Sequence, residues 1–337
     1  MLDLLETSPK DWHFFAKGNA NALFQYQGDN TDFQRFLLRL RLEKNTQQYV
    51  SVAELDAFIK NTCEPLFPRQ IVDTQMIEVP EQFRTQLATP GFTLMSTEPH
   101  GFLTFNVRAG GNFQSYKLLK YCALHVGSTR KGSESGNEIE SVLFEFKPKW
   151  LYEPKEKYCR TCLLKQSKGH KRHFCCLDLL REDRQEQGVH DLLSEVPKEV
   201  LDQLDREEIP LAQVILEFVR EKGNVLQQLK LNEAVGEEDS ILALNSEKDV
   251  LEKLSLVMTL RDVGLFLKVM RFDDNYSRES DYYYYKHNDK TYELSSCLYD
   301  LDLKSSARFT HWKAIEEELQ SYYNSDTSDW PQCRMNS

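Results

Sequence analysis

Charged side chains of both signs gather in the stretch 298–313, LYDLDLKSSARFTHWK. Asp300, Asp302 and Lys304 alternate with leucines, so on a strand the two carboxylates and the ammonium group would share one face. Arg308 follows at helical spacing. Carboxylate oxygens hold Mg²⁺ or accept a proton, and cations spread the negative charge of a phosphate. This stretch is therefore the first candidate for a reaction site.

A basic segment, residues 147–172, lies inside an acidic chain. It contains nine Lys or Arg residues and two Asp or Glu residues, whereas the whole chain has a formal net charge of −11. A concentrated positive site in a negative protein suits a compact, highly charged anion, although composition alone also fits a solvated surface. The motif EFKPKW favours the anion, because Lys147 and Lys149 would share one face of a strand and Pro148 suits a strand edge.

Cysteines with metal-ligand spacing begin inside the basic segment. In YCRTCLLKQSKGHKRHFCC, Cys159 and Cys162 form a Cys-x-x-Cys pair, and His173 and Cys175 come after it. These four residues can supply the nitrogen and sulfur ligands of a structural zinc ion, and the alternative is a cluster of reduced, partly buried thiols. A catalytic zinc ion is not expected, because this stretch contains no acidic general base.

Length, charge and apolar runs limit the class of protein. The 337 residues are enough for one large or two moderate domains. No apolar run approaches the ~20 residues of a membrane span, and the N-terminus MLDLLETSPKDW lacks the features of a secretory signal. The net charge argues against broad binding to nucleic acid or acidic membranes. We therefore expect an intracellular protein whose cysteines are thiols or metal ligands rather than disulfides.

Apolar periodicity predicts the elements that position these residues. Gly18 lies in the turn of a predicted hairpin within residues 12–42, and residues 273–290 read as a polar loop. The other predicted strands are 103–109, 118–126, 142–152 and a buried pair within 254–272 around Arg261 and Asp262. The predicted helices are 50–63, several within 190–230, and a last one from Ser305 or Ser306 to about Tyr323.

Together these features fit phosphoryl transfer, in which a turn covers the ATP phosphates, carboxylates hold Mg²⁺ or take the acceptor proton, and cations spread the transition-state charge. The motifs KGNANALFQY, EFKPKW, CRTCLL, CCLDLL, LRDVGLFL and LYDLDLK occur in the order typical of the inositol pentakisphosphate 2-kinases. Over roughly residues 12–323 the chain resembles a short fungal member of that family, and EFKPKW and YDLDLK are its most specific motifs. The resemblance implies phosphorylation of the axial 2-hydroxyl of inositol pentakisphosphate to inositol hexakisphosphate (phytate), with ATP and Mg²⁺ as cofactors.

The resemblance also implies an α+β fold with two lobes, similar to protein kinases, and ATP between the lobes. The Gly- and Ser-rich stretch 127–141 has the composition of a surface loop, and we place the domain boundary there. The N-terminal lobe would then cover residues 1–138 and carry the glycine hairpin. The C-terminal lobe would cover 139–337, with an inositide-binding insertion at about 151–250.

The family motifs assign roles to single residues of this chain. The nucleotide residues are Gly18, Asn19 and Asn21, with Arg39 and Arg41 near the ATP phosphates. The inositide residues are Lys147, Lys149, Arg160, Lys168, Lys304 and Arg308, and the last two also hold the transferred phosphate. Asp262 matches the aspartate that receives the hydroxyl proton and reaches the metal, and Asp300 matches a Mg²⁺ ligand. Because an aspartate buried without a partner is costly, we expect a metal or a lysine beside Asp262.

Two candidate substrate residues depart from the family pattern. Asn224, in KGNVLQQ, is a weak match to an Asn-Asn-x-Arg motif whose arginine is missing here. Trp312 lies near the position of a family tyrosine; it can stack on a ligand but cannot donate a hydrogen bond in the same way. The zinc site of plant members has no obvious counterpart in this chain, so the resemblance does not decide the cysteine question.

Two other functions remain as alternatives. The other inositol polyphosphate kinase family has a Pro-x-x-x-Asp-x-Lys-x-Gly motif, and DLDLKS supplies its Asp-x-Lys but neither the proline nor the final glycine. A zinc-stabilised nucleic-acid module around 155–180 is disfavoured by the acidic total charge and the lack of aromatic-rich basic strands. We expect small-molecule substrates, a monomer without nucleic acid or membrane partners, and a nuclear or cytoplasmic location, of which the family resemblance favours the nucleus.

Overall fold

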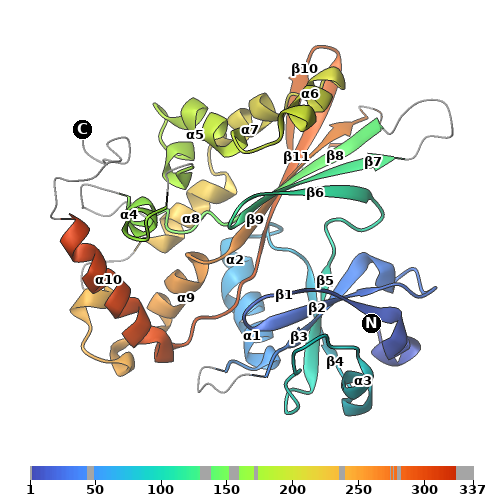
Figure 1. The fold of residues 1–337 in the computed structure, drawn as a ribbon, viewed down its shortest axis with the longest axis vertical. Coiled ribbons are helices and arrows are strands. Elements are labelled where there is room, and N and C mark those ends of the chain that lie inside the picture. The colour runs from blue at the N-terminus through green and yellow to red at the C-terminus, as the bar shows by residue number, and fades with distance from the viewer. Residues whose placement is uncertain are drawn as a thin grey trace. The chain divides into compact units, whose positions relative to one another are not determined.

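The computed structural model describes residues 2–43, 49–129, 138–151, 159–170, 174–234, 240–273, 275, 277–278 and 282–323. The chain forms two compact units, Met1–Asn112 and Phe113–Ser337 (Figure 1). The loop at which we predicted the domain boundary lies inside the second unit, because the strands that flank it, β7 (Cys122–Thr129) and β8 (Glu138–Phe146), are antiparallel neighbours. The division between the units therefore comes earlier in the chain than the composition of the loop suggested.

The first unit is built on an antiparallel sheet with the strand order β1-β2-β3-β5-β4. Its strands are β1 (Trp12–Lys17), β2 (Asn21–Tyr26), β3 (Phe36–Arg41), β4 (Thr74–Glu78) and β5 (His100–Phe105). Alternate residues of β2 are buried, and Phe24 packs in one core with Trp12, Phe33 and Leu38. The predicted hairpin is confirmed as β1 and β2, with Gly18 in the turn between them.

Helix α1 (Val52–Phe58) confirms the amphipathic helix predicted in this unit and continues as a π-helical turn at Ile59–Cys63. A capping box fixes its start, because the Ser51 hydroxyl accepts from the Glu54 N–H while the Glu54 carboxylate accepts from the Ser51 N–H. The other helical elements of the unit are α2 (Glu64–Leu66), α3 (Glu81–Gln86) and 3₁₀ turns at Leu4–Glu6, Pro9–Asp11 and Phe33–Arg35.

The second unit is built on a six-stranded sheet with the strand order β10-β11-β9-β8-β7-β6. Its strands besides β7 and β8 are β6 (Asn112–Leu119), β9 (Gly264–Phe272), β10 (Tyr283–His287) and β11 (Lys290–Tyr299). Its helices are α4 (Arg160–Ser167), α5 (Gln185–Leu193), α6 (Lys198–Arg206), α7 (Leu211–Arg220), α8 (Val225–Glu233), α9 (Glu252–Leu260) and α10 (Phe309–Tyr323). Its 3₁₀ turns are Cys176–Leu179, Ile241–Ala243, Glu247–Asp249 and Ser306–Arg308.

The helices of the second unit lie in two groups (Figure 1). Helix α7 packs on β10 and β11, while α4 and α10 pack together and α8 contacts α9. Between α9 and α10 a buried apolar cluster forms from Ile241, Leu254, Met258, Phe309 and Trp312. The helices predicted within 190–230 and after Ser305 are confirmed, and no helix in the described part of the chain has the length and apolar character needed to cross a bilayer.

Three predicted elements differ from the structure. The first half of the predicted strand pair within 254–272 is helix α9, whose Leu254, Val257 and Met258 are buried at helical spacing; a short apolar run does not distinguish a buried helix from a strand. The second half is confirmed as β9. The predicted polar loop 273–290 contains β10, a run of tyrosines that pairs with β11 across a turn at Asn288. The predicted strand 118–126 spans the turn between β6 and β7.

The predicted strands that carry the charged motifs end early. β8 ends at Phe146 rather than at Tyr152, and β11 ends at Tyr299, so the alternation of Asp300, Asp302 and Lys304 is not a strand. The backbone leaves the extended region after each strand, with a φ of 62° at Lys149 and 63° at Asp300. The charged residues are therefore held at strand ends and not along a strand face.

Candidate active site

Three strand ends meet at one edge of the six-stranded sheet. β9 lies between β8 and β11 and runs antiparallel to both, and its first residues pair with the last residues of its neighbours, Leu265 with Phe146 and Gly264 with Tyr299. The residues that follow β8 and β11 therefore lie beside the residues that precede β9. This register brings together segments that are far apart in the sequence.

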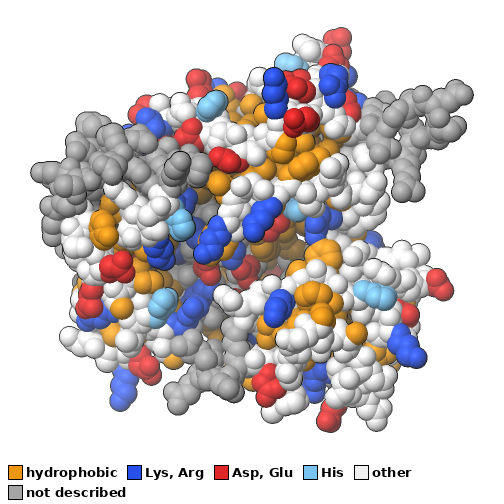
Figure 2. Space-filling view, viewed as in Figure 1, with side chains coloured by type: hydrophobic (Ala, Val, Ile, Leu, Met, Phe, Trp, Pro, Cys, Tyr) orange, Lys and Arg blue, Asp and Glu red, His pale blue; other side chains and the backbone are white. Residues whose placement is uncertain are grey.

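The lysine–aspartate cluster, which consists of Lys147, Lys149, Asp262, Asp300 and Lys304, is built on these strand ends. Lys147 Nζ lies 2.5 Å from Asp300 Oδ2 and donates to the Asp262 carbonyl oxygen at 3.0 Å. The Asp262 carboxylate accepts from the other two lysines, from Lys149 Nζ at 2.5 Å and from Lys304 Nζ at 2.7 Å. The lysine partner expected for Asp262 is thus present. Figure 2 shows basic and acidic side chains close together on one face of the protein.

Local contacts fix the backbone and side chains of the cluster. Lys149 and Asp300 hold left-handed backbone conformations, which are uncommon outside glycine and persist where the surrounding structure determines them. The Lys304 N–H donates to Thr259 Oγ1 at 3.0 Å, and Lys149 Nζ lies 4.4 Å from the centroid of the Tyr121 ring. The cluster is therefore ordered by the protein alone.

The cluster favours the ionised form of the Asp262 carboxylate. Burial by itself would raise the pKa of Asp262, but the ammonium groups of Lys304, Lys149 and Lys147 outweigh it and hold that pKa well below its usual range. Burial would lower the pKa of Lys147, but the carboxylates of Asp300 and Asp262 outweigh it and raise that pKa. Three ammonium groups thus face two carboxylates, an arrangement that can bind an anion, hold a divalent cation and accept a proton from a hydroxyl.

The turn between β1 and β2 carries the predicted nucleotide residues. The Gly18 N–H donates to the Asn21 carbonyl at 2.9 Å, and the Leu42 N–H donates to the Ala20 carbonyl at 2.9 Å, so main-chain bonds define the turn. A pocket of about 560 Å³ lies beside it, lined by Lys17, Gly18, Asn19, Leu42, Glu43, Phe92 and Thr93. A Cβ at Gly18 would have no described atom within 4 Å, so this face of the turn is open to a ligand.

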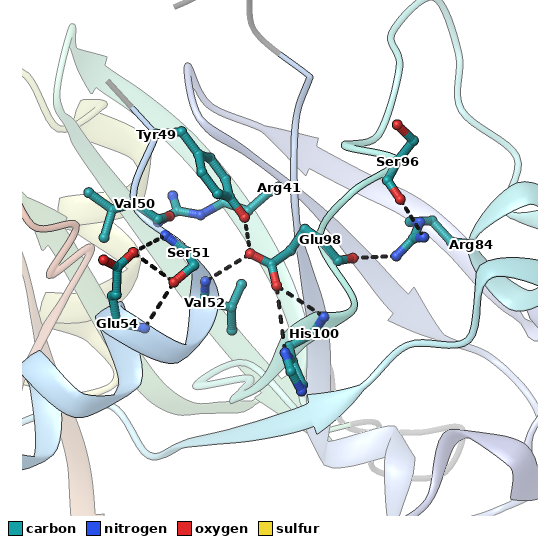
Figure 3. Close-up of polar contacts among 10 residues, drawn as sticks. All are labelled: Arg41, Tyr49, Val50, Ser51, Val52, Glu54, Arg84, Ser96, Glu98 and His100. Carbon is teal, nitrogen blue, oxygen red and sulfur yellow. Dashed lines mark hydrogen bonds and ion pairs between the residues drawn. The ribbon is translucent and has the colours of Figure 1, made fainter. Parts of the chain in front are cut away.

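Arg41 connects this turn to the segment before α1, and Figure 3 shows its side chain near Tyr49 and Val50. Its guanidinium donates to Asn21 Oδ1 at 3.2 Å and to the Val50 carbonyl at 3.0 Å. Next to it, the buried Glu98 carboxylate accepts from the Tyr49 hydroxyl and from the Val52 N–H at 2.9 Å. In this structure Arg41 stabilises the turn through its hydrogen bond to Asn21. The predicted contacts of Arg41, and of the half-buried Arg39 on the same strand, with the ATP phosphates stay predictions.

Several other predicted site residues have structural partners. Asn224 is fully buried at the start of α8; it accepts from the N–H groups of Leu226 and Gln227 and donates to the carbonyls of Val219 and Glu221. These four bonds use the whole hydrogen-bonding capacity of its amide, which argues for a capping role. Trp312 lies in the apolar cluster between α9 and α10.

Cationic candidates differ in their exposure. Arg160, 8% exposed, donates to the Glu316 carboxylate, with 2.8 Å from Nε to Oε1. Lys168 is exposed at the end of α4, and Arg308 is half-buried in the turn before α10. Their contacts with the inositide stay predictions.

Three of the four predicted zinc ligands lie together. The Sγ atoms of Cys159, Cys162 and Cys175, here called the thiol cluster, are all within 4.8 Å of one another, and those of Cys159 and Cys175 are 3.7 Å apart. All three side chains are buried. The fourth predicted ligand, His173, lies outside the described residues.

Two residues beside the lysine–aspartate cluster were not predicted as candidates from the sequence. Trp150 and Arg261 adjoin Lys149 and Asp262 in the chain and stack on each other, with 3.9 Å from the Arg261 Cζ to the indole centroid. The available signal was the tryptophan at the end of EFKPKW, an aromatic residue directly beside a predicted anion site.

Comparisons with known proteins cover both compact units. A model of the inositol-pentakisphosphate 2-kinase family matches residues 14–318. An inositol-pentakisphosphate 2-kinase of Debaryomyces hansenii is 39% identical to this chain over 97% of the chain and 95% of its own length. The enzymes of that name from Saccharomyces cerevisiae and Eremothecium gossypii are 24% and 22% identical over 90% and 91% of this chain, and over 95% and 96% of their own lengths.

Proposed function

Because this chain belongs to the family of inositol-pentakisphosphate 2-kinases, we propose that it phosphorylates the 2-hydroxyl of its inositide at the lysine–aspartate cluster, with ATP and Mg²⁺. The chain is a kinase that converts inositol pentakisphosphate to inositol hexakisphosphate, so its substrates are small molecules. The observation that carries the assignment of the site is the meeting of three ammonium groups and two carboxylates at three strand ends.

Asp262 is the proposed acceptor of the hydroxyl proton. As the inositide oxygen bonds to the γ-phosphorus, the bond from that phosphorus to the bridging oxygen of ADP breaks, and the proton passes to the Asp262 carboxylate. The lowered pKa of Asp262 makes it a weak base but a good hydrogen-bond acceptor. Such a group suits a loose transition state, in which orienting the hydroxyl matters more than removing its proton early.

Asp300 is the proposed ligand of Mg²⁺, with Asp262 as a second one. Carboxylate oxygens are the ligands this cation prefers. The side chains of Asp300 and Asp262 are 34% and 36% exposed, so their oxygens are accessible to an ion. When bound, the ion would neutralise charge on the transferred phosphate. The lysines that pair with these aspartates are the proposed partners of the substrate phosphates, so binding would exchange lysine–carboxylate pairs for lysine–phosphate pairs.

The lysine–aspartate cluster has more ammonium groups than carboxylates, and this excess of positive charge is proposed to select a highly phosphorylated substrate. Five phosphate groups at roughly −1.5 to −2 each give the inositide a charge of roughly −8 to −10. Lys147, Lys149 and Lys304 are held by contacts that are already in place, and Arg308 and Lys168 are the proposed additions from the turn before α10 and the end of α4. Once Mg²⁺ and the 2-hydroxyl engage the carboxylates, a substrate that lacks a phosphate would leave a desolvated cation without its partner.

The glycine turn of the first unit is the proposed nucleotide element. Its open face at Gly18 and its adjoining pocket can admit phosphates close to the main chain. Asn19 lies in the same turn, Asn21 follows it at the start of β2, and the Arg41 guanidinium donates a hydrogen bond to the Asn21 side chain. Arg39 is the proposed contact to the ATP phosphates from β3.

The thiol cluster is proposed as a structural zinc site. Zinc–sulfur bonds of about 2.3 Å in a tetrahedron place two sulfurs about 3.8 Å apart, close to the 3.7 Å between Cys159 and Cys175. His173 is the proposed fourth ligand from the sequence. Elemental analysis of the purified protein should find close to one zinc per chain, and Cys159→Ser should lose it while Cys63→Ser, in the first unit, keeps it. Less than about a tenth of an equivalent, where a structural site holds one ion, would leave a reduced thiol cluster.

The activity is tested by incubating the purified protein with ATP labelled at the γ-phosphate and inositol pentakisphosphate. The expected product is inositol hexakisphosphate with the label at position 2, formed only when Mg²⁺ is present. Inositol trisphosphates should be poorer substrates, mainly in kcat/KM. Equal turnover of a trisphosphate and the pentakisphosphate would contradict the proposed role of the cations.

A further inference from the structure

A tryptophan is enclosed between two arginines next to the lysine–aspartate cluster. The Arg160 Cζ lies 3.7 Å from the centroid of the Trp150 ring, and the Arg261 Cζ lies 3.9 Å from it. Both arginines are buried, with 8% and 4% of their surfaces exposed. Contacts of this kind are worth most where they are shielded from water. We call these three residues the Arg–Trp–Arg stack.

Hydrogen-bond acceptors on two helices hold the two cations of the stack. Arg160 donates to the Glu316 carboxylate on α10, through Nε at 2.8 Å and through a second guanidinium nitrogen. Arg261 donates to the Glu233 carbonyl at the end of α8, at 3.0 Å. The Glu233 carboxylate, fully buried, accepts from the Leu151 N–H at 2.8 Å. Buried charges need such partners, so these contacts tie the stack to α8 and α10.

Two residues of the stack are sequence neighbours of two residues of the lysine–aspartate cluster. Trp150 directly follows Lys149, and Arg261 directly precedes Asp262. Consecutive Cα atoms are about 3.8 Å apart, so a shift of the indole against the Arg261 guanidinium moves the two backbones that carry the Lys149–Asp262 pair. The left-handed backbone at Lys149 also requires outside support, and the contacts on both sides of Trp150 and at the Leu151 N–H supply it.

The geometry points to Trp150 as a positioning residue, held by Arg160 and Arg261, that places the backbones of Lys149 and Asp262 next to each other at the site of phosphoryl transfer. This inference rests on the proposed function, because Asp262 is the group whose placement matters. Trp150 acts by fixing the backbone positions from which the Lys149 and Asp262 side chains extend, two side chains that pair at 2.5 Å in this structure, and it needs no contact with the substrate. Both partner arginines are required, because a guanidinium on each face prevents the indole from tilting.

The first test compares Trp150→Leu with Trp150→Phe. The leucine removes the ring that the cations contact, whereas phenylalanine retains a π face. Because small displacements of reacting groups are costly, Trp150→Leu should lower kcat by about 10–100-fold and leave the KM for ATP within twofold. Trp150→Phe should restore most of kcat. The matched control is Phe218→Leu, which removes a fully buried ring of α7 that contacts Tyr283; it should lower Tm and leave kcat near that of the wild type.

The second readout does not depend on kinase activity. The rate at which an acylating reagent modifies Lys149, measured by peptide mass spectrometry, reports how firmly the ammonium group is paired with Asp262. It should rise several-fold in Trp150→Leu and stay unchanged in Phe218→Leu, even if the wild-type protein failed to phosphorylate inositol pentakisphosphate. A wild-type acylation rate and wild-type kcat in Trp150→Leu, or equal losses of kcat in the leucine and phenylalanine variants, would overturn the inference.

Discussion

The glycine turn is held by main-chain hydrogen bonds between neighbouring strands, whereas the lysine–aspartate cluster is held by side-chain ion pairs between strand ends that are far apart in the sequence. Apart from Asn21, whose side chain accepts a hydrogen bond from Arg41, the turn should therefore tolerate changes of side chain, because main-chain bonds define its shape. In the cluster each charge balances the others, so one substitution alters the position and ionisation of all its neighbours. The predictions below test this contrast.

The largest effect is expected from Asp262→Asn. Loss of the proton acceptor should lower kcat on the order of 10²–10⁴-fold. Because the substitution also removes a negative charge from among three lysines, the affinity for the inositide should stay the same or increase. Steady-state kinetics together with equilibrium binding of inositol pentakisphosphate measure both. A variant with near-normal kcat would remove Asp262 from the chemistry.

Asp300→Asn should have the second largest effect. It should lower kcat on the order of 10²–10³-fold and raise the concentration of Mg²⁺ that the enzyme requires. The amide keeps the shape of the side chain but is a weaker ligand for a hard cation. The measurement is kcat as a function of free Mg²⁺. Asp202→Asn, an exposed aspartate of α6, is the matched control and should match the wild type. An unchanged Mg²⁺ dependence in Asp300→Asn would place the metal elsewhere.

Lys149→Met should lower kcat/KM for the inositide and leave the KM for ATP unchanged. A hydrogen bond to a charged group is worth about 1.5–3 kcal/mol, which predicts a loss of kcat/KM for the inositide of about 10–100-fold. Added salt should lower it further, since screening weakens the charges that remain. Lys198→Met, at the exposed start of α6, serves as the control. A rise in the KM for ATP alone would contradict the assignment of this lysine to the inositide.

The pH dependence of stability tests the ion pairs themselves. The pKa of Asp262 is lowered in the folded protein, so its ionised form stabilises the fold above the unfolded pKa of about 3.9, and this stabilisation is lost as the pH falls through the folded pKa. The Tm of the wild type should exceed that of Asp262→Asn by a constant margin from neutral pH down to about 5, and the margin should shrink below about 4. If the difference in Tm between the wild type and Asp262→Asn became larger as the pH falls, the proposed stabilisation by the ionised Asp262 would be contradicted.

Gly18→Ala should have the smallest effect. The Cβ has space in the free turn and the φ of this glycine is not positive, so the fold and Tm should be retained. A phosphate that approaches the main chain would meet the added methyl group, so the KM for ATP should rise a few-fold while the KM for the inositide stays constant. An equal rise in both constants would show that the turn does not serve the nucleotide alone.

The same contrast explains what the sequence could predict. The hairpin, α1, the helices within 190–230 and the helix after Ser305 were predicted from local periodicity, and in the structure Ser51 and Glu54 cap the start of α1. Helix α9, which comes just before Asp262, was predicted as a strand, because a short apolar run fits either a buried helix or a strand. Nothing local indicates that β8 and β11 end just before Lys147 and Asp300, since that depends on the left-handed backbone that the tertiary structure imposes.

Spacing and charge indicated Lys147, Lys149, Asp300 and Lys304 as candidates, and the family motifs supplied their individual roles and the role of Asp262. The sequence also indicated a lysine partner for Asp262, from the cost of burying an unpaired carboxylate. The amide of Asn224 and the indole of Trp150 required the structure, because their roles are set by the backbone groups and cations that surround them.

The most direct test of the central claim is a crystal structure with inositol pentakisphosphate and a non-hydrolysable ATP analogue. The 2-hydroxyl should lie about 2.6–3.2 Å from the Asp262 carboxylate, the distance required of a proton acceptor. Lys147 and Lys149 should have exchanged an aspartate for a phosphate of the inositide. An inositide bound away from these lysines, or an Asp262 carboxylate that points away from the 2-hydroxyl with both ligands in place, would contradict the account.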